Sequence, residues 1–258
     1  MPATEEVVLA TVQRVLKPIQ QFVRGWMTGD ETEQLAQRLG LRNGNDVWIV
    51  GRAGVLGDGD ADVAAAGLGF LSRAGVRAAW ESLPIGITPL VVAHEYAQLC
   101  AAWGSQALAA FDPARMARMD ELGRRIINAA DGALGPVFAG WRAMPPPTEV
   151  GARAALTMHV LRELRGGAHI AAVFASGITP LEAVLASPAP APRHGPGWAE
   201  HLKWAGPFPE TSDAMRAARL SAEALTSRML IPAFSTLSEA ELEEFGELAE
   251  TTRNAIDM

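Results

Sequence analysis

Residues 4–26, TEEVVLATVQRVLKPIQQFVRGW, decide the fold class. Their apolar side chains recur every three or four positions, which is the spacing of one face of an α-helix. The Thr4 hydroxyl is placed to cap the first turn, and Pro18 should kink the helix. The residues predicted to share the buried face are Val8, Val12, Val15, Ile19, Phe22 and Trp26. The stretch therefore predicts an amphipathic helix.

The same spacing continues along most of the chain, and alternating runs of β-branched residues are scarce. Helix starts are marked by a capping side chain before a proline, as in Thr88-Pro89 and Asp112-Pro113. The S/T-x-x-E spacing at 179–182 and 238–241 predicts two more starts. The sequence therefore predicts an all-α protein.

A proline-rich segment, SPAPAPRHGPG at 187–197, cannot form regular helix and is the best linker candidate. It would separate a multi-helix N-terminal body, residues 1–186, from a smaller C-terminal helical unit, residues 198–258. The sequence thus predicts two helical units joined by this linker.

Composition narrows the classes of function. The chain has 258 residues, 49% of them hydrophobic, which is enough for a substantial core. A formal charge of −7 argues against general attraction to nucleic acid or anionic lipid. Cys100 is the only cysteine, so neither an intrachain disulfide nor a cysteine-based zinc site is expected. Without a basic leader or a long apolar run, we expect a cytoplasmic protein that does not enter a membrane.

A glycine- and aspartate-rich stretch, GRAGVLGDGDAD at 51–62, has the composition of a ligand-binding loop. Its aspartates copy the first five positions of an EF-hand calcium loop, but position six is Val63 and position twelve is Gly69. The three carboxylates would also repel a phosphate. We therefore expect a tight turn, with Asp60 capping the following helix.

Arg52, in the same stretch, has two interpretations. It follows an apolar run at an expected helix end, where the helix dipole favours a cation. Its neighbours Gly51 and Gly54 would also allow backbone or ligand to approach closely, and a partly buried guanidinium needs a carboxylate or carbonyl partner.

The densest polar cluster on an apolar helix is TMHVLRELRGGAHIAAVFASG, residues 157–177. Two pairs spaced four apart can each share a helix face: His159 with Glu163, and Arg165 with His169. The glycine pair at 166–167 should break or thin the helix, so that His169 lies where a helix restarts.

His169 keeps several interpretations open. It can be a hydrogen-bonded core residue, an acid-base catalyst, an axial haem ligand or one ligand of a metal. Partners for a metal would come from His94, Glu95, His159 and Glu163. No ExxH pair has the spacing used by di-iron bundles, and we expect no metal site.

Aromatic residues suggest where a flat apolar ligand would bind. Trp141-Arg142 precedes a triple proline, and Trp198, Trp204 and Phe208 lie near the linker, so they would border a pocket between the units. The alternative is ordinary packing of the two units. The chain has no G-x-S-x-G elbow, no P-loop and no strand-linked G-x-G-x-x-G, which weakens standard hydrolase and nucleotide chemistries.

Three segments, GRAGVLGD, FAGWRAMPPP and LRELRGGAHIAAVFASGITPLEA, carry a resemblance over most of the chain. The chain resembles an actinobacterial family of helix-turn-helix-related, winged-helix-like proteins, mostly of unassigned function. Two marks of that family have counterparts here: Gly51, Arg52 and Ala53, and also Arg165, Gly166 and His169. The resemblance implies that Arg52, Arg165 and His169 form one site.

The resemblance also implies a C-terminal winged helix that binds DNA, and here the sequence departs from the family. Residues 207–230 lack a wing-like turn, so the unit resembles a degenerate winged helix. Residues 196–258 hold five basic residues against eleven carboxylates, whereas a recognition helix presents a basic surface to phosphates. Nucleic acid is therefore not the expected partner.

Our first hypothesis is a protein that binds an apolar or aromatic small molecule between its helical units. The polar contacts would come from Arg52, Arg165 and His169, with Trp141 and Arg142 lining the site. If the protein is an enzyme, His169 is the acid-base residue. The alternatives are a transcription regulator with an altered winged-helix unit and a haem-binding protein. The sequence leaves monomer and homodimer open.

Overall fold

The computed structural model describes residues 3–188 and 193–253, and in this part of the chain it has helices and no β-strand. The all-α prediction is confirmed. None of these helices combines the length and the apolar character needed to cross a membrane. The helices are α1 Glu5–Met27, α2 Asp30–Leu39, α3 Gly44–Ala53, α4 Ala61–Leu68, α5 Arg73–Trp80, α6 Pro89–Ala107, α7 Pro113–Ala129, α8 Pro136–Ala143, α9 Val150–Ala175, α10 Pro180–Leu185, α11 Pro196–His201, α12 Asp213–Phe234 and α13 Glu239–Arg253, with short 3-10 turns η1 Gly54–Leu56 and η2 Gly132–Leu134.

Helix α1 forms as its sequence predicts. The Thr4 side chain accepts a hydrogen bond from the Val7 amide and caps the helix. All six apolar side chains predicted for the inner face are buried, and the helix continues through Pro18. Burial of this stripe holds α1 against the rest of the protein.

The other capping predictions are confirmed as well. Thr88 and Asp112 cap α6 and α7, each followed by proline at the first helical position. Thr179 and Glu182 form the capping box of α10. These local signals depend on neighbouring residues alone, which is why the sequence reveals them.

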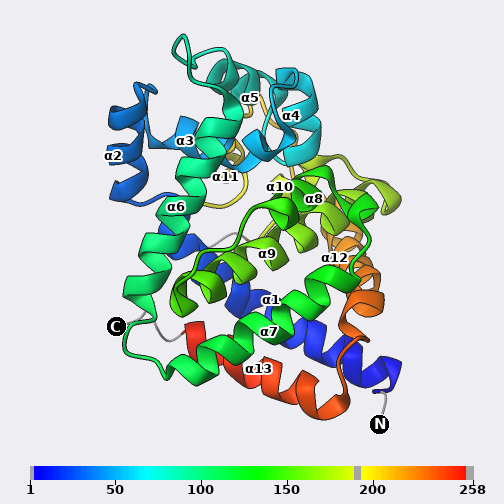
Figure 1. Cartoon of the computed structure of the whole chain (residues 1–258). Helices are drawn as coiled ribbons and strands as arrows, with labels where there is room; N and C mark the ends of the chain where they lie inside the picture. Colours follow the sequence, from blue (N-terminus) through cyan, green and yellow to red (C-terminus); the bar gives the residue numbers. More distant parts are fainter. Residues whose placement is uncertain (1–2, 189–192, 254–258) are drawn as a thin grey trace.

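Helix α9 is the central element of the fold and packs against α1, α6, α7, α8 and α12 (Figure 1). The predicted break at 166–167 is wrong, because α9 is continuous from Val150 to Ala175. A Cβ on Gly167 would lie 2.3 Å from the Leu134 carbonyl oxygen and 2.8 Å from the Gly135 Cα. The glycine therefore serves close backbone packing against the η2 turn instead of ending the helix.

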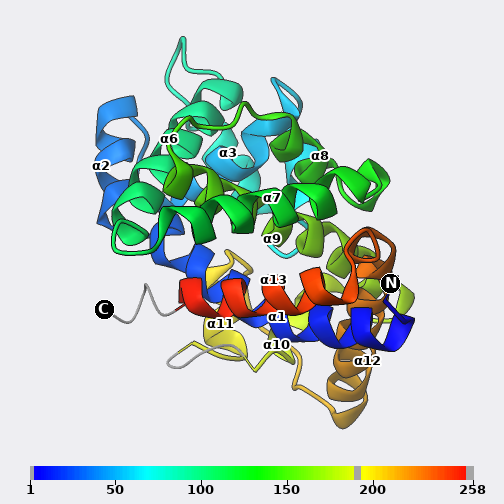
Figure 2. The same cartoon turned by 60° about the horizontal axis from the view of Figure 1, so that its bottom comes forward.

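The C-terminal helices α12 and α13 cover α1, α7 and α9, and α13 runs alongside α1 (Figure 2). Phe234 and Phe245 belong to the same core as the buried face of α1. On the surface, Arg14 of α1 binds Glu243 and Glu250 of α13. The two predicted units thus share one core here; their separate folding stays a prediction, and part of the 187–197 linker lies outside the described residues.

Candidate functional site

The turn at 57–60 leads into α4. Gly57 adopts a φ of +80°, and the Asp60 side chain caps α4 by accepting a hydrogen bond from the Asp62 amide. The Asp62 carboxylate is bound by Arg73 and Arg77. Among the described residues, no group of three or more His, Cys, Asp or Glu side chains is placed to hold a metal ion. Asp60 and Asp62 thus have structural roles, one in capping α4 and the other in binding the two arginines of α5.

Arg52 lies in the interior, with 6% of its surface exposed. Its Nε and Nη2 atoms donate to the two carboxylate oxygens of Glu163 on α9, at 2.9 and 3.0 Å. Its carbonyl oxygen accepts a hydrogen bond from Trp141 Nε1 at 2.9 Å. Arg52 thereby joins α3 to α8 and α9, and its charged group is paired within the protein.

Glu163 holds a second arginine, because Arg162 Nη1 donates to its Oε1 atom at 2.5 Å. Burial by itself would raise the pKa of Glu163, but Arg162 and Arg52 together hold it well below the usual range. His159 Nε2 lies 3.9 Å from the same oxygen. We call Arg52, His159, Arg162 and Glu163 the Glu163 cluster.

His159 is fully buried within the Glu163 cluster, beside the rings of Trp26, Tyr96 and Trp141. Neither of its ring nitrogens has a hydrogen-bond partner among the described residues. Burial lowers the pKa of His159 to about 3, so the ring is neutral at physiological pH. The residue brings two unsatisfied polar atoms into the core.

His169 has partners on both ring nitrogens. Arg219 Nη1 lies 2.8 Å from Nε2, and the Thr226 hydroxyl lies 2.8 Å from Nδ1. Because a guanidinium can only donate, Nε2 is the acceptor and Nδ1 carries the proton. Thr226 in turn donates to the Ala222 carbonyl at 2.6 Å. The result is a directed chain of hydrogen bonds from Arg219 through a neutral imidazole to the backbone of α12.

Glu223 of α12 connects this chain to Arg165 of α9. Its Oε2 atom accepts a hydrogen bond from Arg165 Nη2 at 2.6 Å, and its Oε1 atom pairs with Arg219 Nη2 at 2.8 Å. The Nε atoms of both arginines are buried and have no hydrogen-bond partner among the described residues. We call Arg165, His169, Arg219, Glu223 and Thr226 the Glu223 cluster.

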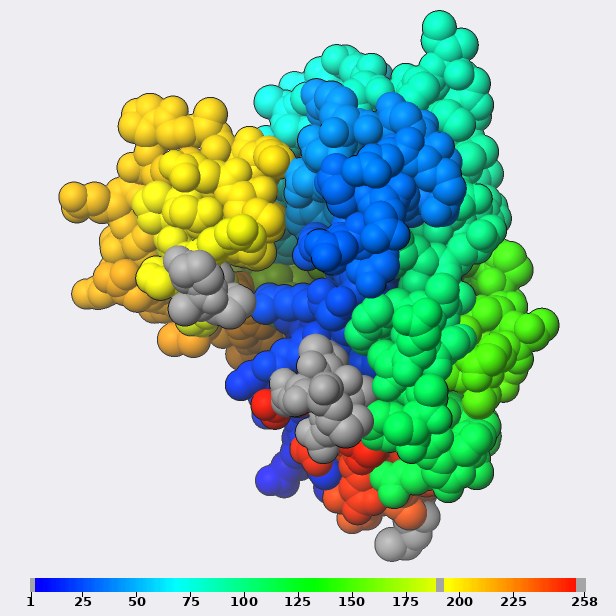
Figure 3. Space-filling view, turned by 90° about the vertical axis from the view of Figure 1, so that its left-hand side faces the viewer, coloured from blue at the N-terminus to red at the C-terminus, as the bar shows by residue number. Residues whose placement is uncertain are grey.

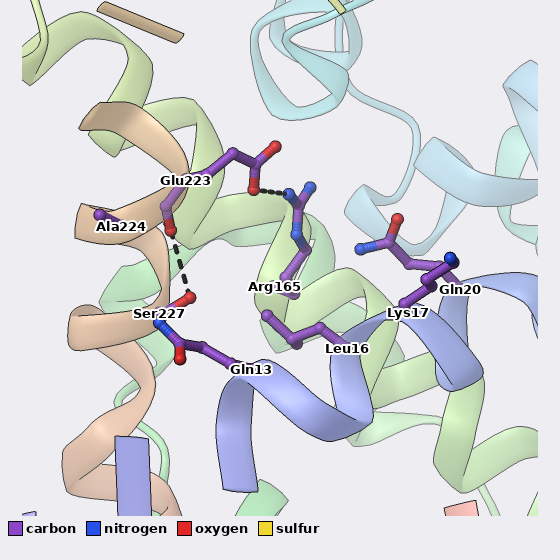
Figure 4. Close-up of a pocket in the computed structure, with 8 residues that line it drawn as sticks. All are labelled: Gln13, Leu16, Lys17, Gln20, Arg165, Glu223, Ala224 and Ser227. Atoms are coloured by element: carbon purple, nitrogen blue, oxygen red, sulfur yellow. Dashed lines mark hydrogen bonds and ion pairs between the residues drawn. The ribbon is translucent and has the colours of Figure 1, made fainter. Parts of the chain in front are cut away.

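The Glu223 cluster borders a pocket of about 380 Å³ between α1, α9 and α12. Figure 3 shows the surface hollowed between the N-terminal helices and the yellow-to-orange segment that includes α11 and α12. In Figure 4, the Arg165 guanidinium lies between the Glu223 carboxylate and the Gln20 amide. The lining residues are Gln13, Leu16, Lys17, Gln20, Arg165, Glu223, Ala224 and Ser227. We call this the α1/α9/α12 pocket.

The structure divides the predicted site residues between two places. Arg165 lines the pocket and His169 supports it, whereas Arg52 belongs to the Glu163 cluster. The physical reason is the helical geometry of α9. Glu163, which binds Arg52, and Arg165 are two residues apart, which places their side chains about 200° apart around the helix axis. The three residues therefore do not meet at one point.

Trp141 and Arg142 do not line the pocket either. Trp141 is 1% exposed, and Arg142 donates to the Ala130 carbonyl and lies over the Phe138 ring. Near the linker, Trp204 Nε1 donates to the Phe70 carbonyl. These contacts favour the packing interpretation of the aromatic residues.

A haem site is poorly matched to His169. An axial ligand offers a free ring nitrogen to the iron, and both nitrogens of His169 are used by Arg219 and Thr226. The Phe70 ring also stacks on the imidazole, with ring centroids 5.2 Å apart. The residues present do not fit the cofactor.

Sequence reasoning missed Glu223 and Lys17, which line the pocket, and Arg219, which pairs with Glu223. A signal was present, since Arg219 and Glu223 are four apart and share one face of α12. What the sequence did not contain was the approach of α12 to α9, which brings together residues fifty or more positions apart.

Comparison with known proteins adds the family. A family model described as "Helix-turn-helix family" matches residues 10–257, which is nearly the whole chain. No curated protein and no solved structure matches the sequence. The family match spans the helices that build both clusters and the pocket between α1, α9 and α12. The chain belongs to the helix-turn-helix family.

Proposed function

We propose that the α1/α9/α12 pocket binds a small organic molecule that carries a carboxylate. Its volume of about 380 Å³ falls within the range of small-molecule sites, roughly 300 to 1,000 Å³. Three different helices supply its walls, so a ligand would contact parts of the chain that are far apart in sequence. Such convergence is typical of binding sites in helical proteins.

The observation that carries this proposal is the state of Arg165. Its side chain is 15% exposed and lines the pocket, yet one of its donors, Nε, has no partner among the described residues. The Nε atom is itself buried, so a ligand in the pocket would meet the guanidinium at its Nη groups, one of which is paired with Glu223. A ligand carboxylate is the planar acceptor that a guanidinium binds best.

Charge around the pocket favours the same class of ligand. Lys17 lines the pocket and makes no ion pair with the described residues. With Arg165 this makes two lining cations against the single lining carboxylate, that of Glu223. In a chain whose formal charge is −7, this is a local excess of positive charge that attracts an anion.

The remaining lining residues limit the rest of the ligand. Leu16 and Ala224 give the pocket two apolar positions, and Gln13 and Gln20 add amide groups. A carboxylate on a short apolar skeleton matches this mixture. In the proposal His169 is a positioning residue, because its ring nitrogens are used to hold Arg219 and Thr226.

Isothermal titration calorimetry with 4-methylpentanoate and 3-phenylpropanoate tests the proposal. We expect saturable binding of these acids and none of the corresponding primary amides, which lack the negative charge. Arg165→Gln should weaken binding by about ten-fold or more, since a charge-assisted bond is worth roughly 1.5 to 3 kcal/mol. The matched control Arg228→Gln alters an exposed arginine on α12 and should leave binding unchanged. Equal binding by acid and amide would overturn the proposal.

DNA binding is the second candidate, favoured by the family match. Helix pairs joined by short turns include α2–α3, α4–α5 and α12–α13. The two arginines of α5, Arg73 and Arg77, are paired with Asp62. Most of α3 is buried, and α13 exposes Glu239, Glu243, Glu247 and Glu250. None of these second helices thus offers the basic face that a DNA groove requires. Fluorescence anisotropy with duplex DNA between about 50 and 200 mM salt decides the matter, because phosphate contacts give a steep loss of affinity with salt.

A further inference from the structure

We infer that the ligand of the α1/α9/α12 pocket carries a cationic amine beside its carboxylate, as an amino acid does, and that Glu223 receives the amine. This inference rests on the proposed function, which concerns only the carboxylate. It adds the chemical class of the ligand and gives the acidic wall of the pocket a role.

The pocket presents both signs of charge on facing walls. Arg165 and Glu223 both line it and point toward each other from α9 and α12 (Figure 4). The Glu223 side chain is 37% exposed, far more than the 15% of Arg165. Both of its carboxylate oxygens are paired, Oε1 with Arg219 and Oε2 with Arg165, so a ligand cation gains Oε2 when Arg165 releases it.

A simple carboxylate fits this arrangement poorly. It would compete with Glu223 for the Arg165 guanidinium, since the two side chains are joined at 2.6 Å. If it entered, two carboxylates would face each other across a partly buried space, where repulsion is stronger than in water. Glu223 would be the cause of that penalty.

A zwitterion removes the penalty. Its carboxylate replaces Glu223 as the partner of Arg165, and its ammonium group replaces Arg165 as the partner of Glu223 Oε2. Each buried charge keeps a partner of opposite sign, and the net charge of the pocket does not change. The ion pair seen in the structure is therefore the arrangement that a zwitterion can open without leaving a charge unpaired.

The placement of the lining residues sets the orientation. In Figure 4, Gln20 and Lys17 lie on the opposite side of Arg165 from Glu223. The ligand carboxylate takes the place of Glu223 Oε2 at Arg165 Nη2, so that its amine lies beside Glu223, while Lys17 and Gln20 border the guanidinium from the other side. The apolar skeleton would lie against Leu16 and Ala224.

Three matched probes separate the contributions of the two charges: L-leucine, 4-methylpentanoate, which lacks the amine, and 3-methylbutylamine, which lacks the carboxylate. The same three-member series built on alanine and on phenylalanine varies the size of the apolar part. Binding is measured by calorimetry on the full chain. We expect at least one amino acid to bind ten-fold or more tightly than both of its partners, a difference of about 1.4 kcal/mol.

Glu223→Gln distinguishes amine recognition from a merely structural role of Glu223. It should weaken binding of the amino acid by about ten-fold. Binding of the matching amine-free acid should be unchanged or tighter, because Arg165 is then no longer paired with a carboxylate of the protein. Loss of affinity for both ligands would mean that Glu223 only positions Arg165, and would overturn the inference. Glu247→Gln changes an exposed glutamate on α13 and serves as the matched control.

The outcomes also separate this inference from the proposed function. If amine-free acids bind as tightly as the amino acids, and Arg165→Gln abolishes both, the carboxylate site stands and the amine site falls. If no member of the three series binds, both fall. If the amine alone binds as tightly as the amino acid, the pocket recognises a cation, and the carboxylate site is wrong.

Discussion

Removing the Glu163 carboxylate should cost more stability than removing either arginine bound to it. Glu163 is 2% exposed at its side chain and holds Arg52, 7% exposed, and Arg162, 24% exposed. Glu163→Leu leaves two guanidinium groups next to each other without a counter-charge. Arg52→Leu leaves Glu163 with Arg162 as its partner.

The structure sets the expected magnitudes. Breaking a buried ion pair by removing one partner costs about 3 to 5 kcal/mol, and Glu163→Leu should fall in that range. For a domain of this size such a loss lowers Tm by roughly 6 to 20 °C, while typical stabilities leave the variant folded. Arg52→Leu should cost less, about 2 kcal/mol, because a charge pair survives. In the double variant only Arg162 remains, and it is partly solvated.

Urea denaturation followed by tryptophan fluorescence measures all three free energies of unfolding. We expect the double variant Arg52→Leu/Glu163→Leu to be more stable than Glu163→Leu alone by about 1 kcal/mol. With about 2 kcal/mol lost in Arg52→Leu, this corresponds to a coupling energy of about 3 kcal/mol, at the upper end of the range for residues in contact. If instead the two single losses add, Arg52 and Glu163 are not coupled. That result would contradict the buried pair as the link between α3 and α9.

Further changes on α9 have opposite expected signs. Gly167→Ala should destabilise the protein by several kcal/mol, because the added Cβ would lie 2.3 Å from the Leu134 carbonyl oxygen. Gly166→Ala, whose added Cβ would have its nearest contact at 3.8 Å, should stabilise the protein by roughly 0.5 to 1 kcal/mol. Equal effects of the two substitutions in thermal melts would contradict the close packing at Gly167. His159→Leu should leave the free energy of unfolding unchanged or raise it by about 1 kcal/mol, because it removes two polar atoms that have no partner among the described residues. A large loss of stability in urea denaturation would show that the imidazole makes a hydrogen bond that the fold requires. Burial holds the pKa values of His159 and His169 at about 3, below the unfolded value of about 6.5, so the unfolded chain binds more protons between these pH values. The contribution of these histidines to stability should therefore be complete above pH 6.5 and fall as the pH drops toward 3. If the free energy of unfolding of the wild type did not change over this pH range, or if His159→Leu showed the same pH dependence as the wild type, the buried imidazoles would not be neutral.

The sequence predicted those features of the fold that depend on near neighbours. The buried face of α1, the proline-preceded starts of α6 and α7 and the capping box of α10 all follow from residues within one or two turns. The glycine pair at 166–167 led to the wrong prediction of a helix break. A glycine is required at 167 because the backbone of Leu134, far away in sequence, packs directly against it. A helix propensity contains no information on such a contact.

The candidate site was predicted only in part, because some of its residues are near neighbours in sequence and others are not. The four-residue spacing of Arg165 and His169 correctly placed them on one face of α9. Their partners, Glu223 and Thr226, come from α12, and only the packing of that helix turns two polar residues into a pocket wall. Arg52 has its own partner, Glu163, on a different face of α9, so it is not part of the pocket that Arg165 lines.

The most direct test of the proposed carboxylate site is the NMR signal of the Arg165 Nε–H group, assigned by its loss in Arg165→Gln, during titration with L-leucine and 4-methylpentanoate. This group belongs to the guanidinium that would bind the carboxylate and has no hydrogen-bond partner among the described residues, so a bound carboxylate should shift its resonance and the shift should saturate with ligand concentration. A resonance that stays in place while either compound binds elsewhere, or while neither binds, would contradict the claim that Arg165 recognises a carboxylate in the α1/α9/α12 pocket.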